Sequence, residues 1–205
     1  ELYDCQADPQ NLRNLADSRK HQAILNRLRT AHRKHIRDTV DLGFLPESEA
    51  WEMFIKTPGW TLGQSGKVNM VPIHAAAAQV GFASEKAIVK NLTSQNPSIR
   101  YWAAIALANR EKISPETKLQ LQKLLTDPSP AVRIETANTL AQRAAGILSA
   151  DPHSPLTTLI KALKHENLII VTHAARTIEL LGKNAIAAKP PMERALIRAE
   201  KIRPP

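Results

Sequence analysis

The chain has 205 residues and a net charge of +9, with 4% aromatic residues and only seven glycines. This composition favours helices over sheets and predicts a mostly α protein. A single cysteine, Cys5, excludes an internal disulfide, and no apolar run approaches the roughly 20 residues that a membrane-spanning helix requires.

Residues 1–45 predict a strand, a turn and a basic helix. Leu2 and Tyr3 form a short β-prone stretch, Asp8 and Pro9 are a turn signal, and residues 14–17 hold helix-capping side chains. We expect the strand to have lost its partner, as in a piece of a larger protein.

The basic helix allows two interpretations. Seven Lys or Arg stand against two Asp between Asp17 and Asp38. The basic side chains can be the solvated face of an amphipathic helix, or they can bind a polyanion, either nucleic acid or a sulfated sugar. The candidate polyanion-binding residues are Arg27, Arg29, Arg33, Lys34 and Arg37. The expected apolar side consists of Ile24, Leu25, Leu28, Ala31 and Ile36.

Residues 46–68 predict an irregular connector with one short helix near residues 47–54, because prolines and glycines interrupt the periodicity. The segment GQSGK, residues 63–67, has the ending of a phosphate-binding loop. However, Thr61 stands where the earlier glycine is required and Val68 follows the lysine, so a turn is expected. Trp60 is a possible stacking platform, whereas Trp102, beside Tyr101, is expected in the core.

Residues 69–205 predict stacked helical hairpins, because the sequence repeats. Residues 96–109 superpose on 129–142 after a shift of 33, and residues 168–182 follow after a further shift of about 38. The first helices are expected at 84–92, 115–125 and 155–163, with Ser84, Ser114 and Ser154 as N-caps. A leading helix at 71–80 and a trailing helix from Pro191 complete the array.

The repeated unit resembles the HEAT repeat. The resemblance rests on DPSPAVR, residues 127–133, and implies that Asp127 and Arg133 help to lock successive turns together. Arg100 is the equivalent arginine one unit earlier, whereas Ser94 and His165 replace the aspartate in the flanking units. The sequence therefore predicts a HEAT-like α-solenoid of about three hairpins with an incomplete ladder.

Three phrases also resemble the C-terminal region of bacterial type I, formylglycine-dependent sulfatases. ELYDCQADPQNLRNLAD is similar to the end of their small C-terminal subdomain, DTVDLGFLPESE to the segment that leaves it, and RYWAAIAL to a phrase in a following HEAT-like tail. The resemblance implies a parent enzyme that hydrolyses sulfate esters or sulfamates with formylglycine and calcium in an upstream domain. It also implies a periplasmic or extracellular location.

No catalytic, cofactor-binding or metal-binding set is expected in this chain itself. Cys5 lacks the C/S-x-P-S-R context of formylglycine and is expected to be a small buried hydrophobe. His21, His32 and His35 have no acidic or thiol partner at ligand spacing, which favours packing or surface roles. The expected partners are the parent's catalytic domain, a second subunit or a sulfated glycan. The alternative is a free-standing HEAT scaffold or DNA-binding module.

Overall fold

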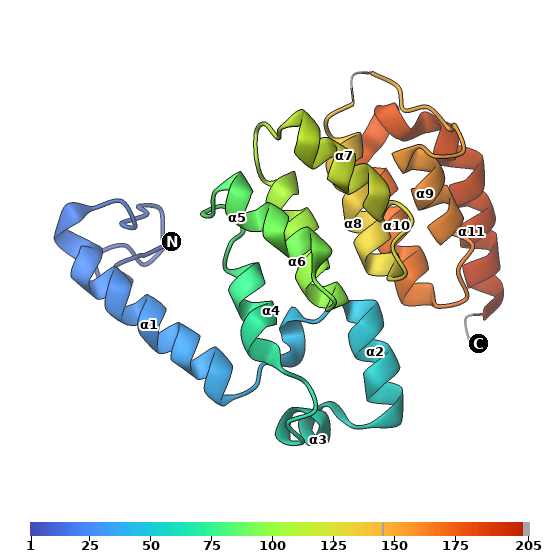
Figure 1. Ribbon diagram of the computed structural model, residues 1–205. Coiled ribbons are helices and arrows are strands. Elements are labelled where there is room, and N and C mark those ends of the chain that lie inside the picture. The colour runs from blue at the N-terminus through green and yellow to red at the C-terminus, as the bar shows by residue number, and fades with distance from the viewer. Residues whose placement is uncertain (145, 203–205) are drawn as a thin grey trace. The chain divides into compact units, whose positions relative to one another are not determined.

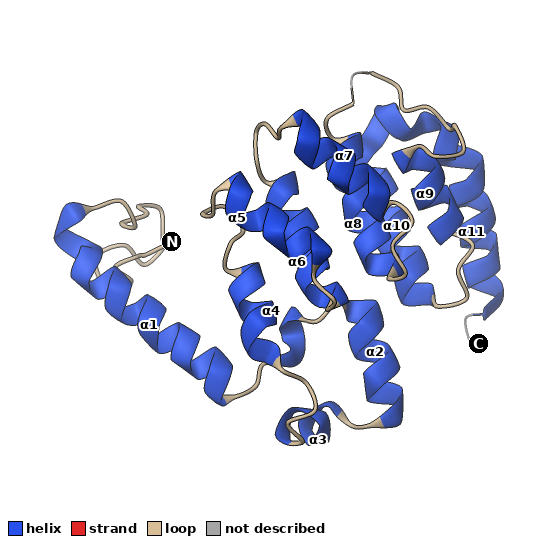
Figure 2. Cartoon of the chain, in the orientation of Figure 1, coloured by secondary structure: helices blue, strands red, loops and turns tan. Residues whose placement is uncertain are grey.

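The computed structural model describes residues 1–144 and 146–202. The chain forms two compact units, one from Glu1 to Asp41 and the other from Leu42 onward. Across the described residues every regular element is a helix (Figures 1 and 2). The prediction of a mostly α protein is therefore confirmed.

The predicted strand at the start of the chain is wrong. Leu2 and Tyr3 have no strand geometry, because among the described residues the backbone pairing of this stretch is limited to one hydrogen bond from Leu15 N to Leu2 O, of 2.7 Å. A strand requires a ladder of such bonds with a neighbour. Asn14 does not cap the helix either, because its Oδ1 accepts from Leu2 N at 3.0 Å and from Ala16 N at 3.1 Å, in a turn that lies before the first helical residue. The helix begins later, with a 3₁₀ turn, η1 (Arg19–His21), and then α1 (Gln22–Asp38).

Cys5 is exposed, which corrects its expected burial. The cysteine lies in a turn whose backbone N–H groups at Gln6 and Ala7 donate to Asp4 Oδ1 at 3.1 Å. A turn held in this way projects the thiol into solvent, whereas an inward-facing strand position would have covered it.

The apolar side of α1 is narrower than predicted. Leu25 and Ile36 are buried, but Ile24 and Leu28 are 44% and 46% exposed, and Ala31 is exposed. The first unit therefore has very few buried apolar side chains.

The second unit begins with four short helical elements. These elements are η2 (Leu42–Phe44), α2 (Glu47–Lys56), α3 (Gly59–Gln64) and α4 (Met70–Ala77). The helices predicted near residues 47–54 and 71–80 are present as α2 and α4, whereas α3 lies where the predicted connector was irregular. Pro46 and Pro58 do not prevent α2 and α3 from forming, because each proline occupies the N-cap position, before the first residue of the helix. A proline there removes no hydrogen bond from inside the helix.

Three helical hairpins follow, as the 33-residue period predicts. The first pairs α5 (Glu85–Val89) and η3 (Lys90–Thr93) with α6 (Pro97–Ala108); the second pairs α7 (Pro115–Leu124) with α8 (Pro130–Ala141); the third pairs α9 (Pro155–Ala162) with α10 (Leu168–Leu181). η4 (Gly182–Ala188) and α11 (Lys189–Ile202) end the described array. The last three residues of the predicted repeat domain, 203–205, lie outside the described residues.

The predicted serine caps form. Ser84, Ser114 and Ser154 each accept a hydrogen bond from the backbone N–H three residues later, at 3.4, 3.1 and 3.1 Å. Proline at the first helical position of α7 and α9 suits such a start, since the first N–H has no partner inside the helix. The caps thus set where each first helix begins.

The second helices of the hairpins stack side by side, with α4 before them, and the first helices cover one side of this layer (Figure 1). Ala104 and Ala137 are fully buried where adjacent helices approach. The equivalent Ala175 is half-buried and its neighbour Ala174 is fully buried instead. The buried apolar side chains form two clusters along the array, and Leu125 packs against both of them. Neighbouring hairpins thus bury their apolar faces against each other, the arrangement of a HEAT-like α-solenoid.

Candidate functional site

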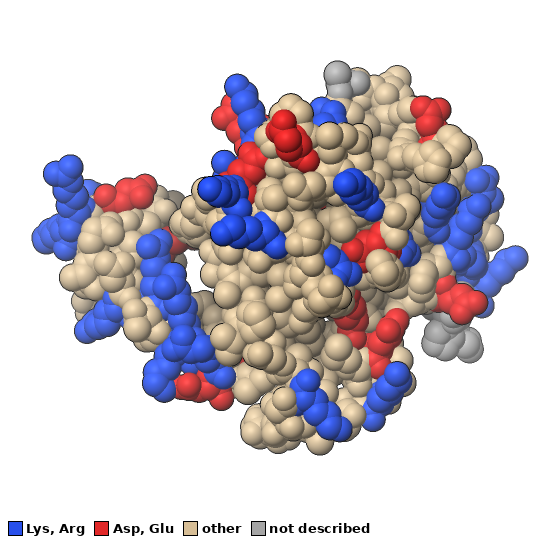
Figure 3. All heavy atoms as spheres, viewed as in Figure 1, with Lys and Arg blue, Asp and Glu red and all other residues tan. Residues whose placement is uncertain are grey.

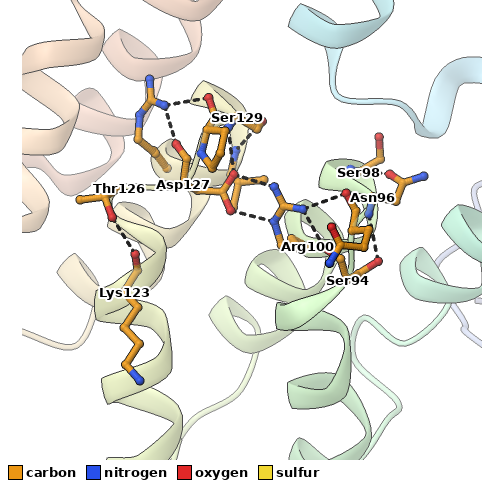
Figure 4. Close-up of polar contacts among 12 residues, drawn as sticks. Ser94, Asn96, Ser98, Arg100, Lys123, Thr126, Asp127 and Ser129 are labelled. Atoms are coloured by element: carbon orange, nitrogen blue, oxygen red, sulfur yellow. Dashed lines mark hydrogen bonds and ion pairs between the residues drawn. The ribbon is translucent and has the colours of Figure 1, made fainter.

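One arginine joins the turns of the first two hairpins (Figure 4). From α6, Arg100 Nε donates to Asp127 Oδ2 and Nη2 to Oδ1, both at 2.7 Å. Its Nη1 donates to the backbone oxygens of Ser94 at 2.7 Å and Gln95 at 3.2 Å. The two side chains are 12% and 3% exposed, so this bidentate, charge-assisted pair is a strong link between units.

The next arginine repeats only half of this arrangement. Arg133 Nη1 donates to Asp127 O at 2.6 Å and Pro128 O at 3.0 Å, as Arg100 does in its own turn. His165 occupies the position where a third aspartate would stand, and none of the ion pairs among the described residues includes Arg133. Burial lowers the pKa of the Arg133 guanidinium, and the Asp127 carboxylate opposes this shift.

Two further arginines, each located just after a second helix, bind carbonyl oxygens from earlier in the chain, and sequence reasoning missed them. Arg143 Nη2 donates to Leu107 O at 2.6 Å and to Arg110 O at 2.6 Å, and Arg110 Nη1 donates to Ala83 O at 2.9 Å. Burial lowers the pKa of Arg143. The signal was present, because Arg110 and Arg143 are 33 residues apart, the same shift that aligns the second helices.

Glu49 of α2 links two repeat turns, which sequence reasoning also missed. Its carboxylate accepts from Ser98 Oγ at 3.0 Å and from Ser129 Oγ at 2.7 Å. Both serines lie at helix N-termini, where a negative charge is favourable. No local pattern could have revealed the contact, since Ser129 is 80 residues from Glu49.

Glu85 makes a similar link between the first helices. It accepts from Ser114 N at 2.9 Å and from the hydroxyl of Thr117. The hydrogen bond from Thr117, followed by that from the Ser114 backbone, lowers the pKa of the Glu85 carboxyl.

Polar and aromatic residues also meet across the three second helices. His173 Nε2 lies 2.7 Å from Glu135 Oε1, and the ring of Tyr101 contacts those of Trp102 and His173 edge-on. Burial, together with the nearby glutamates led by Glu135, raises the pKa of Tyr101. Trp102 is half-buried and its Nε1 donates to Phe44 O at 2.7 Å, so it secures η2 against α6.

The predicted polyanion-binding side chains of α1 are all exposed. Figure 3 shows Lys and Arg side chains gathered over the part of the surface where Figure 1 places α1. Arg29, Arg33 and Arg37 recur at intervals of four residues and therefore follow one stripe of the helix. Lys34 pairs with Asp38 on the same helix. The arrangement is a basic helical surface within the first unit.

Other sequence candidates do not form sites. In the GQSGK segment the Ser65 hydroxyl donates to Leu62 O at 2.6 Å and closes a turn. Trp60 is 79% exposed. Within residues 1–144 and 146–202, no group of three or more His, Cys, Asp or Glu could hold a metal ion. None of the helices described is long and apolar enough to cross a membrane.

Comparison with known proteins agrees with the fold. A family model described as HEAT repeats matches residues 85–175, which begin at α5 and end within α10. No curated protein matches the chain significantly. From residue 85 to 175 the chain is thus similar to HEAT repeats, and it carries a helical repeat scaffold of the kind that often mediates protein–protein interaction.

Proposed function

We propose that this chain is the non-catalytic C-terminal part of a formylglycine-dependent sulfatase, in which the repeats contact the enzyme's own catalytic domain or a second subunit. The contact role rests on exposed apolar side chains of the adjoining helices α2 and α3. Trp51, Ile55 and Trp60 are 52%, 71% and 79% exposed. Large apolar side chains gathered on a surface mark interaction sites.

The first unit supports the same proposal. Its helix α1 buries only Leu25 and Ile36, and a unit of this size gains little stability from so small a core. Such a segment suits a role in completing a larger domain. The phrases that resemble the sulfatase subdomain lie mainly in this unit and directly after it.

The reading frame upstream of Glu1 tests the origin. A long frame with a C/S-x-P-S-R motif supports a sulfatase parent, which would carry the calcium and formylglycine and act in the periplasm or outside the cell. An immediate start codon contradicts it.

Binding of the separate chain to the parent's catalytic domain tests the contact role. Replacing Trp51 and Trp60 with serine should raise the dissociation constant about tenfold or more, which is about 1.4 kcal/mol. The matched control is Leu119→Ser, which removes an exposed apolar side chain from α7. Equal affinities for all three proteins would contradict the proposed surface.

The basic surface of α1 supports a second role within this proposal, which is to hold a sulfated glycan near the parent's active site. Reversing Arg27, Arg33 and Arg37 to glutamate should lower the salt concentration that elutes the chain from immobilised heparin. Reversal of Lys86, Lys118 and Lys123, which are exposed on the repeats, gives the same change in net charge. If both variants elute alike, net charge rather than α1 explains retention.

The HEAT match also suits a second function, a free-standing scaffold or DNA-binding module. A basic solenoid that binds duplex phosphates releases counterions, so its affinity falls steeply with salt whatever the DNA sequence. Titration of a random duplex at two salt concentrations distinguishes this function. Tight, salt-dependent binding together with an immediate start codon would favour it over the sulfatase tail.

A further inference from the structure

We call the contact between an arginine of one second helix and the side chain that precedes the next second helix a rung. Arg100 and Asp127 form the rung between the first two hairpins, and the rung between the second and third hairpins lacks a carboxylate. Ser94, Asp127 and His165 each stand two residues before the N-cap of a second helix. Each accepts the backbone N–H two residues later, at 3.2, 2.9 and 3.0 Å. His165 therefore builds its turn as Asp127 does in the preceding unit. However, an imidazole cannot accept two hydrogen bonds from one guanidinium, as the Asp127 carboxylate does from Arg100.

The open rung presents hydrogen-bond donors. Arg133 is held by its Nη1, and its Nε and Nη2 make no hydrogen bond with the described residues. In His165, Nδ1 accepts from Asn167 N, so the neutral ring carries its proton on Nε2. Both side chains thus offer donors to a third group.

A pocket of about 370 Å³ lies at this position. It is lined by Arg133 and His165 together with Lys161, His153, Thr126 and Thr158, and no carboxylate lines it. The hydroxyls of the two threonines donate to Lys123 O and Ser154 O. The nearby Asp127 carboxylate is already paired with Arg100. A concave site whose lining is positively charged attracts anions.

We propose that this pocket binds an aspartate or glutamate side chain from an extended segment of a partner protein, which completes the rung as Asp127 does in the preceding one. The Arg100 rung shows the geometry, with two N–H···O bonds of 2.7 Å to the two oxygens of one carboxylate. An arginine fork matches such a planar acceptor with two oxygens. The proposal does not depend on a sulfatase parent.

The test titrates the protein with two five-residue peptides that differ only in a central aspartate or asparagine, followed by amide NMR shifts at low salt. The aspartate peptide should shift signals of residues around the pocket and bind at least tenfold more tightly than the asparagine peptide. Arg133→Gln should weaken this binding at least tenfold. Lys118→Gln, an equal change of charge at an exposed position on α7, should leave it unchanged.

A second variant decides the result if Arg133→Gln fails to fold. His165→Asp keeps the arginine and supplies the missing carboxylate from within the chain. It should abolish peptide binding and raise Tm by about 2–4 °C, the shift that corresponds to a modest gain in a protein of this size. Retention of peptide binding by this variant would overturn the proposal.

Two further outcomes overturn it. Equal shifts with the aspartate and asparagine peptides would mean that no carboxylate is recognised. The second outcome comes from titrating a sulfated disaccharide in the same way. If the disaccharide binds through Arg133 and the aspartate peptide does not bind, the pocket recognises a sulfated glycan rather than a protein.

Discussion

Helices α1 and α8 show how differently two helices of one chain are stabilised. α8 has 12 residues, eight of them buried, and packs against α6, α7, α9 and α10. α1 has 17 residues and buries only Leu25 and Ile36. Tertiary packing therefore supplies most of the stability of α8, whereas α1 depends on its own turns and on whatever covers its exposed side chains. Substitutions should have large effects around α8 and small ones on α1.

The largest effect is expected in the core beside α8. Leu159 of α9 is fully buried, so Leu159→Ala should lower the free energy of unfolding by about 2–5 kcal/mol, because it removes apolar burial and leaves a cavity. Leu119→Ala, on α7 at 60% exposure, should change it by less than about 0.5 kcal/mol. Urea unfolding measures both, and similar losses would contradict the assigned core.

The next largest effect on the free energy of unfolding is expected from a buried ion pair, and an exposed ion pair provides the control. Asp127→Asn keeps the shape of the side chain but leaves the Arg100 charge buried without its partner, which should cost about 3–5 kcal/mol. Asp38→Asn breaks the ion pair between Lys34 and Asp38, in which the two side chains are 69% and 55% exposed. The free energy of unfolding should fall by less than about 0.5 kcal/mol, because solvent screens this pair. Equal costs in urea unfolding would show that the Arg100 rung does not lock the hairpins.

A smaller effect concerns the start of α7. Ser114→Ala removes the side-chain acceptor for Thr117 N, so the free energy of unfolding should fall by about 1 kcal/mol. Ser114→Thr retains the oxygen and should recover most of the loss. If alanine and threonine behave alike in thermal unfolding, the serine is not acting as a cap.

The smallest effect is the pH dependence of the link from Glu85. Its pKa is lowered in the folded state by Thr117 and Ser114, so the carboxylate stabilises the fold fully above the ordinary glutamate pKa, about 4.3. This stabilisation is lost as the pH falls through the lowered pKa. At pH 7 the wild-type protein should have a higher Tm than the Glu85→Gln variant. The difference in Tm should shrink below about pH 4. A difference that is constant with pH would contradict the link.

Local chemistry made the repeats predictable. The prolines and serines that open the helices act within three residues, and the 33-residue period places Arg100 and Arg133 at equivalent positions in the first turns of α6 and α8. From this pattern the HEAT-like hairpins, their caps and the missing aspartate at His165 could be read. The short helix near residues 47–54 could also be read and is present as α2, but α3 could not, because its six residues are too few to show a helical period.

The sequence by itself determined that this protein is helical, repetitive and basic, because helix propensity, capping and apolar period act over short distances. Only the tertiary structure decided that Glu49 spans two repeat turns, that Leu2 and Tyr3 form no strand, and that Arg133 faces a pocket without a carboxylate. These features depend on groups brought together from distant parts of the chain, and no local pattern records which groups will meet.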